Sequence, residues 1–251
     1  MLTLTQFILR LSFGLAAAMM LVSPRQVTSG YYRNNLYVLL GLNVLVALLT
    51  GGGQVSSHPF WPSVAAAVLS YVGAVLWLYE RPRLGLLALA LVASADLTAA
   101  RLAATAGETL LMSPVFAWLD PLTGGLLLGT TMAAMLLGHW YLNAPGMPLA
   151  PLWRLTGLLA LAVVLRAGVC AWGFSQDVAA TGWPTMTDVL FLSLRWLGGL
   201  VGTAVLAAMA WQTLKIPNTQ SATGILYVAV ITTFLGELAS GLLSAQSGYP
   251  L

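Results

Sequence analysis

Long apolar runs alternate with short polar segments along the whole chain. A helix needs about 20 mainly apolar residues to cross the roughly 30 Å hydrocarbon core of a bilayer, and eight stretches come close to or exceed this length. Their approximate bounds are 3–22, 35–51, 60–79, 84–104, 121–142, 152–174, 188–212 and 221–244. The pattern therefore predicts an all-α, polytopic bundle of eight transmembrane helices in a single integral membrane domain over residues 1–251.

The composition agrees with a chain whose main solvent is lipid. Hydrophobic residues make up 59% of the sequence and charged residues 7%, whereas a soluble domain carries about 25% charged residues. The net charge of +3 is small and is not concentrated in a basic cluster, so we expect no nucleic-acid partner. The N-terminal segment has no basic region before its apolar run, and we therefore interpret it as a retained first span.

Basic residues predict the orientation of the bundle. Lysine and arginine concentrate in the cytoplasmic connections of membrane proteins. Here they occupy alternate connections, at Arg25, Arg33, Arg81, Arg83, Arg154 and Lys215. The other connections contain none, unless Arg101 emerges from the end of the fourth span. We therefore expect both termini on the outer, periplasmic side.

Six ionisable residues lie inside the predicted spans. A charge at the bilayer centre costs about 2.5–3.5 kcal/mol on insertion scales, so these residues should pair across helices or line a polar cavity. At about 1.5 Å per residue, all six fall between the midplane and the outer surface. They are Arg10, Asp96, Arg101, Arg166, Arg195 and Glu237. Their shared depth predicts a polar site in the outer half of the bilayer.

The depths also suggest partners within this set. Arg195 and Glu237 lie at similar depths on consecutive antiparallel spans, which makes them the first-choice ion pair. Asp96 and Arg101 are about 140° apart around one helix, so each should contact another helix instead. Four arginines against two carboxylates leave surplus positive charge, which suits an anionic or carbonyl-bearing ligand. Inert pairs that fix helix register would be the structural alternative, and Arg10 and Arg101 could also reach the headgroups.

Small residues spaced four apart predict close helix packing. They occur in GGLLLG with Gly125 and Gly129, in GGLVG from Gly198 to Gly202, and in GELAS from Gly236. Such spacing lets helix backbones approach one another in membranes. We expect the fifth, seventh and eighth spans to use these positions as interfaces.

The sequence offers few residues for metals or covalent catalysis. Its two histidines, His58 and His139, are predicted at opposite ends of the bilayer, so they cannot both ligate one haem. The lone Cys170 excludes a disulfide framework or a thiolate iron–sulfur site within the chain. No HExxH, GxSxG or Walker A motif occurs, so we expect no metal site and no catalytic residue. His139, beside Trp140 and Tyr141, is a secondary candidate for binding a headgroup or a partner, unless it simply belongs to the interfacial belt.

Three segments resemble the NrfD/DMSO-reductase anchor (DmsC-like) membrane subunits of respiratory oxidoreductases. LDPLTGGLLLGTTMAAMLLGHWYL is similar to the fifth helix of that family. SLRWLGGLVGTAVLAAMAW and YVAVITTFLGELASGLL are similar to its last two helices, which carry an arginine and a Gly-Glu pair. The chain lacks the arginine and the aromatic-tyrosine stretch that commonly follow that pair, and it has no acidic residue in the third span.

The resemblance implies a subunit without a bound cofactor of its own that exchanges electrons with quinone or quinol. Arg195 or Arg166 would polarise a quinone carbonyl, and Glu237 or Asp96 would accept protons. Electrons would pass to a protein partner with iron–sulfur or haem centres. The setting would be the inner (cytoplasmic) membrane of a bacterial-type cell.

Three other functions remain open from the residues. One is a small transporter for an anionic solute, although no internal repeat is seen and the prolines, Pro121 included, lie at span ends. A second is an accessory or assembly protein without a site. A third is an enzyme acting on lipids, which would need acidic loop motifs. The chain offers only isolated acidic residues for these, at Glu108, Asp120, Asp177 and Asp188.

Overall fold

Apolar helices form all of the regular structure in residues 2–52, 59–105, 113–144, 146–216 and 218–251, which the computed structural model describes. Within these ranges eight helical segments are long and apolar enough to cross a membrane, which confirms the predicted number and the all-α class. They are α1 (Leu2–Met20), α2 (Ser29–Gly51), α3 (Phe60–Leu78), α4 (Pro82–Thr105), α5 (Phe116–Asn143), α6 (Ala150–Thr181), the composite seventh segment (Met186–Lys215) and α9 (Thr219–Ser247).

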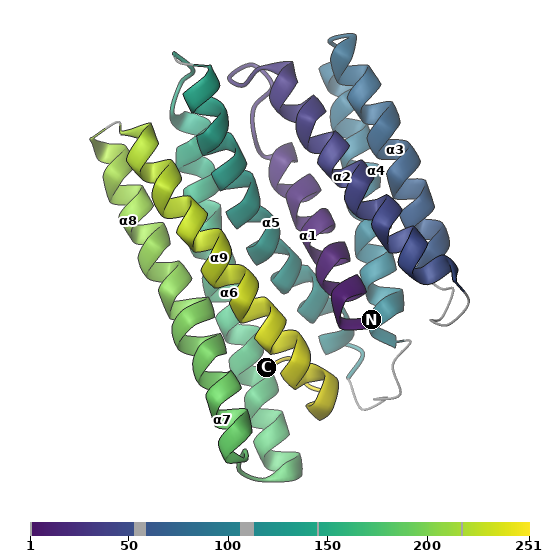
Figure 1. Ribbon diagram of the computed structural model, residues 1–251, viewed down its shortest axis with the longest axis vertical. Helices are drawn as coiled ribbons and strands as arrows, with labels where there is room; N and C mark the ends of the chain where they lie inside the picture. Colours follow the sequence, from purple (N-terminus) through teal and green to yellow (C-terminus); the bar gives the residue numbers. More distant parts are fainter. Residues whose placement is uncertain (1, 53–58, 106–112, 145, 217) are drawn as a thin grey trace.

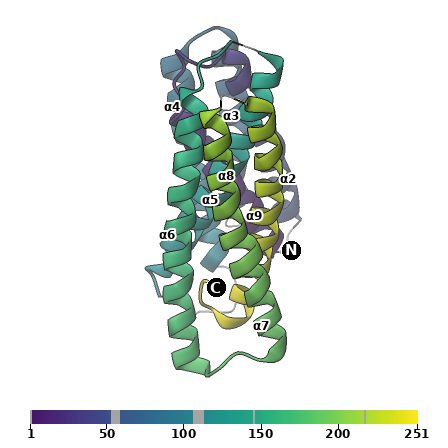
Figure 2. The same cartoon turned by 90° about the vertical axis from the view of Figure 1, so that its left-hand side faces the viewer.

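Two helices, α1 and α5, form the centre of the bundle. In Figure 1, α2, α3 and α4 lie on one side of this pair. Helices α6 and α9, together with α8 (Thr203–Lys215) of the composite segment, lie on the other. Helix α1 packs against α5, α4 and α2, while α5 also packs against α6 and α9. Figure 2 shows the same helices from the side of α6 and α8, and both views place the two chain ends at the same end of the bundle.

The central pair approaches backbone to backbone through glycines. Gly14 of α1 faces Gly125 and Gly129 of α5 so closely that a Cβ atom on Gly14 or Gly129 would overlap the backbone of the other helix. The same type of contact joins the seventh and eighth spans, where Gly199 lies against Gly236. The patterns at Gly125 and Gly129 and at Gly236 therefore mark real interfaces, as the sequence predicts, and the partner of the fifth span is α1. In the seventh span the prediction was off by one residue, because Gly199 makes the contact instead of Gly198 and Gly202.

The seventh span changes its helical geometry near its middle. It begins as α7 (Met186–Ser193), continues as a π-helix, η1 (Leu194–Gly202), and ends as α8 (Thr203–Lys215). A π-helix has wider turns than an α-helix and is frequent at functional sites. Here it contains Arg195 and carries Gly199 to its contact with α9.

The fifth helix begins earlier than hydropathy predicts. It starts at Phe116 instead of residue 121, so Pro121 lies inside the helix and not at its end. Proline has no backbone N–H, so the carbonyl of Ala117, four residues earlier in the helix, loses its usual donor. As a consequence Asp120, expected in a connection, lies on a buried helical turn.

Candidate functional site

Five charged side chains from five helical elements meet inside the bundle, and we call them the ion network. Its members are Arg10 of α1, Asp120 of α5, Arg166 of α6, Arg195 of η1 and Glu237 of α9. None of these residues is more than 9% exposed. Charges buried in this way are tolerated when they are paired and hydrogen-bonded, and four ion pairs connect all five.

Arg166 is the central cation of the ion network. Its Nη1 atom lies 2.7 Å from Asp120 Oδ1, and its Nη2 and Nε atoms lie 2.9 and 3.0 Å from the two carboxylate oxygens of Glu237. Nη2 also donates to the Ser240 hydroxyl at 3.2 Å. Every nitrogen of this guanidinium therefore has a partner, and the two-pronged contact with Glu237 fixes its plane.

Arg10 and Arg195 extend the network in two directions. Arg10 pairs with Asp120 and also donates to Gln6 at 2.9 Å, so it faces the bundle interior and does not reach for the headgroups. Arg195 Nη2 lies 2.8 Å from Glu237 Oε1, which confirms the predicted ion pair. The same nitrogen donates to Cys170 Sγ at 3.3 Å.

Part of the Arg195 guanidinium has no partner. The side chain is fully buried, and yet its Nε and Nη1 atoms make no hydrogen bond. A Cβ atom built on Gly199 or Gly236 would lie 3.5 or 3.4 Å from Nη1, so the two glycines leave this side of the guanidinium uncovered by side chains. Buried donors normally find acceptors, and these two are suited to an oxygen atom of a ligand or of water.

The network carries one surplus positive charge, because three guanidinium groups face two carboxylates. The sequence predicted four arginines and two carboxylates, and this set of residues was partly wrong. It included Asp96 and Arg101, which lie elsewhere, and it missed Asp120. The direction of the imbalance is nevertheless the predicted one.

Asp96 and Arg101 each contact a different helix, as expected from their angular separation. Asp96 is fully buried and accepts a hydrogen bond from Asn43 Nδ2 of α2 at 3.4 Å. The Arg101 guanidinium lies 5.6 Å from the centre of the Trp118 ring of α5. Neither residue belongs to an ion pair of the network, so the six predicted charges form one cluster of four and two separate sites.

His139 lies far from the ion network. It is exposed near the end of α5, where its Nδ1 atom and the Tyr227 hydroxyl are 3.1 Å apart. Nineteen residues separate it from Asp120 on the same helix, which corresponds to about 28 Å. His58 and Glu108 lie outside the described residues. Among the residues that are described, no three or more His, Cys, Asp or Glu side chains are placed to hold a metal ion.

Asp120 is the network residue that sequence reasoning missed. Hydropathy placed the start of the fifth span at Pro121, which left the aspartate in a connection. A helical spacing was present, because Thr123, Gly124 and Leu127 lie three, four and seven residues after Asp120, and all four residues are buried. This stripe of polar and small residues continues from one side of Pro121 to the other. It was the feature of the sequence that indicates a helix beginning before the proline.

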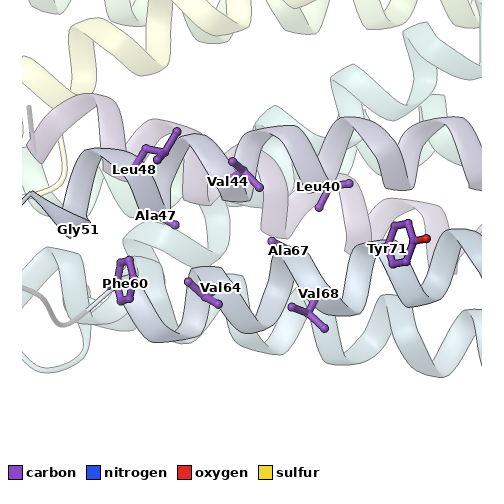
Figure 3. A pocket seen from close by; sticks show the side chains of 10 residues that line it. All are labelled: Leu40, Val44, Ala47, Leu48, Gly51, Phe60, Val64, Ala67, Val68 and Tyr71. Atoms are coloured by element: carbon purple, nitrogen blue, oxygen red, sulfur yellow. The ribbon is translucent and has the colours of Figure 1, made fainter.

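A separate apolar groove of about 670 Å³ lies between α2 and α3 (Figure 3). The residues that line it are Leu40, Val44, Ala47, Leu48, Gly51, Phe60, Val64, Ala67, Val68 and Tyr71. Helices α2 and α3 contribute no member of the ion network, so this groove is not part of the polar site.

Comparisons of the chain with protein-family models, with curated proteins and with solved structures each found no match. Function is therefore inferred from the chemistry of the ion network and from the segments that resemble a known family.

Proposed function

We propose that this chain is a membrane subunit of a respiratory electron-transfer assembly and that it binds quinone or quinol at the ion network. The observation that carries the proposal is the buried Arg195 guanidinium, whose Nε and Nη1 donors have no partner. A quinone carbonyl or a quinol oxygen is an acceptor of the right kind. The surplus positive charge favours the electron-rich oxygen of a reduced quinone.

In this proposal the members of the network have different roles. Arg195 contacts the quinone oxygen and polarises it. Two guanidinium groups surround Glu237 and stabilise its ionised form, so Glu237 orients Arg195 instead of taking up a proton. Arg166 holds Glu237 and Asp120 in place. Asp96 lies outside the network and therefore has no role at the quinone oxygen.

The family resemblance supports the same proposal. The segments that resemble the fifth and the last two helices of the NrfD/DmsC-like anchor subunits supply Asp120, Arg195 and Glu237. In such an assembly, oxidation of a quinol releases two electrons and two protons. The electrons would pass to an iron–sulfur or haem centre of a partner protein in the inner membrane, and the protons would pass to water on the outer side.

Replacing Arg195 with lysine tests the binding role. A hydrogen bond to a charged group contributes about 1.5–3 kcal/mol, so the variant should bind a short-chain benzoquinone or naphthoquinone at least tenfold more weakly. Titration of the purified protein in nanodiscs, by calorimetry, measures this change. The exposed Arg154 provides the control, since Arg154→Gln should bind like the unmodified chain.

The same samples separate quinone binding from the other functions. If quinone does not bind, or if it binds the Arg195→Lys variant unchanged, the proposal is wrong. Uptake of an anionic solute into proteoliposomes that depends on Arg195 would then indicate a transporter. If neither quinone binding nor anion uptake depends on Arg195, the chain is an accessory protein whose ion network only fixes helix packing.

We also propose that both chain ends face the periplasmic side. The basic connections support this orientation, and eight spans require the two ends to share one side. An impermeant maleimide should label Trp183→Cys, in the α6–α7 connection, in intact cells. It should label Arg83→Cys, near the start of α4, only after the membrane is permeabilised. The reverse labelling pattern would invert the proposed orientation.

A further inference from the structure

A second polar site lies among the first four helices and is distinct from the ion network. Asp96 of α4 is fully buried, and its Oδ2 atom accepts a hydrogen bond of 3.4 Å from Asn43 Nδ2 of α2. Among the described residues, Asp96 takes part in none of the ion pairs. A carboxyl group thus lies inside the bundle with an amide as its partner instead of a cation.

Three oxygen atoms at this site have no hydrogen-bond partner. They are Asp96 Oδ1, Asn43 Oδ1 and the Ser12 hydroxyl of α1, and all three residues are fully buried. Each lies three or four residues, one helical turn, from a member of a compact apolar cluster. That cluster consists of Ile8, Leu9, Val46, Ala99, Ala100 and Ala103. Ser12 comes after its cluster residues in the chain, whereas Asn43 and Asp96 come before theirs. Because α1 runs antiparallel to α2 and α4 (Figure 1), all three side chains lie on the same side of the cluster and share one level.

Within the part of the chain that the structure describes, no cation on a neighbouring element is paired with Asp96. Arg10 of α1 pairs with Asp120 of α5, and Arg101 lies over Trp118. On α2, Arg33 is ten residues from Asn43, about 15 Å along the helix. The titratable side chain of α3 nearest this level, Tyr71, is exposed. An ionised carboxylate in this position would be an uncompensated charge in an apolar interior, which proteins avoid by neutralising the group.

We propose that Asp96 is a proton-binding site, with a proton on Oδ1 that is donated to Asn43 Oδ1. The carboxylic acid and the amide then form two hydrogen bonds, one in each direction. A single proton removes the charge and gives partners to two of the three unsatisfied oxygens. Proton-transfer chains of membrane proteins are built from such intramembrane acids. Here the acid would hold a proton inside the bilayer, among the first four helices.

Infrared spectroscopy tests the protonation directly. The spectrum of the unmodified protein minus that of Asp96→Asn, at neutral pH, should contain the carbonyl stretch of a carboxylic acid, and the band should shift in D2O. The matched control is Glu80→Gln, because Glu80 is exposed between α3 and α4. Its difference spectrum should contain ionised carboxylate bands. Carboxylate bands for Asp96 as well would overturn the proposal.

Thermal stability provides a second readout that does not depend on quinone. Asparagine at position 96 preserves both hydrogen bonds to Asn43, so Asp96→Asn should melt at the same temperature as the unmodified protein. A large drop in melting temperature would show that the negative charge is needed. The unmodified protein could instead melt at a higher temperature in NaCl than in choline chloride, with no such difference in Asp96→Asn. That result would show that Asp96 binds a sodium ion instead of a proton, and it would overturn the proposal.

Discussion

Replacement of Arg166 with glutamine is expected to destabilise the protein by about 3–5 kcal/mol, the cost of stranding a buried partner of an ion pair. Arg166 contacts both carboxylates of the ion network. Without it, Asp120 and Glu237 keep one guanidinium each, and the network loses its surplus positive charge. Unfolding by SDS in mixed micelles, followed by circular dichroism, measures the change in unfolding free energy.

Two further variants show that this loss comes from the stranded charge. Arg154→Gln removes an exposed arginine from the same helix, α6, and should leave the unfolding free energy almost unchanged. Arg166→Gln and Glu237→Gln break the same ion pair, so the double variant should be more stable than the sum of the two single changes implies. Additive losses would show that the ion network is not an energetic unit.

The sequence predicts the elements of this site better than their grouping. Apolar runs give eight spans because hydrocarbon thickness sets helix length. Depth counting also pairs Arg195 with Glu237, since consecutive antiparallel helices place equal depths side by side. Depth does not determine which way a side chain points around its helix. Asp96 and Arg101 therefore shared the predicted level with the network and yet face other helices.

Helix rotation is set by packing contacts that hydropathy does not describe. The contact of Gly14 with Gly129 turns Arg10 of α1 toward Asp120 of α5. The contact of Gly199 with Gly236 accompanies the π-helical turn that brings Arg195 to Glu237. Both are distances between backbones, and the sequence shows them only as glycines at suitable spacing. The π-helix itself had no counterpart in the sequence prediction.

Helix α1 connects the two polar sites of the bundle. Arg10 belongs to the ion network, and Ser12, two residues later, lies at the level of Asp96 and Asn43. A displacement of α1 would therefore affect both sites together. The position that controls this displacement is the glycine contact with α5, which holds α1 nearer than any side chain would permit.

The Gly129→Ala change should separate α1 from α5. It should destabilise the protein by about 1–3 kcal/mol, the cost typical of overpacking, or by more. The new Cβ would overlap the backbone of Gly14 and Leu15, and a backbone cannot turn aside as a flexible side chain can. Because Arg10 lies one turn from Gly14 on α1, its pairing with Asp120 should weaken as well. The SDS unfolding midpoint measures the loss of stability.

The matched control is Gly168→Ala in α6, where no atom lies within 4 Å of the added Cβ. An alanine in open space within a helix should have no cost and should stabilise the helix by about 0.5–1 kcal/mol. In a double-mutant cycle, Arg10→Gln should then cost less in the Gly129→Ala background than in the unmodified chain. Equal costs in both backgrounds would mean that α1 keeps its position, and that the glycine contact does not hold the ion network together.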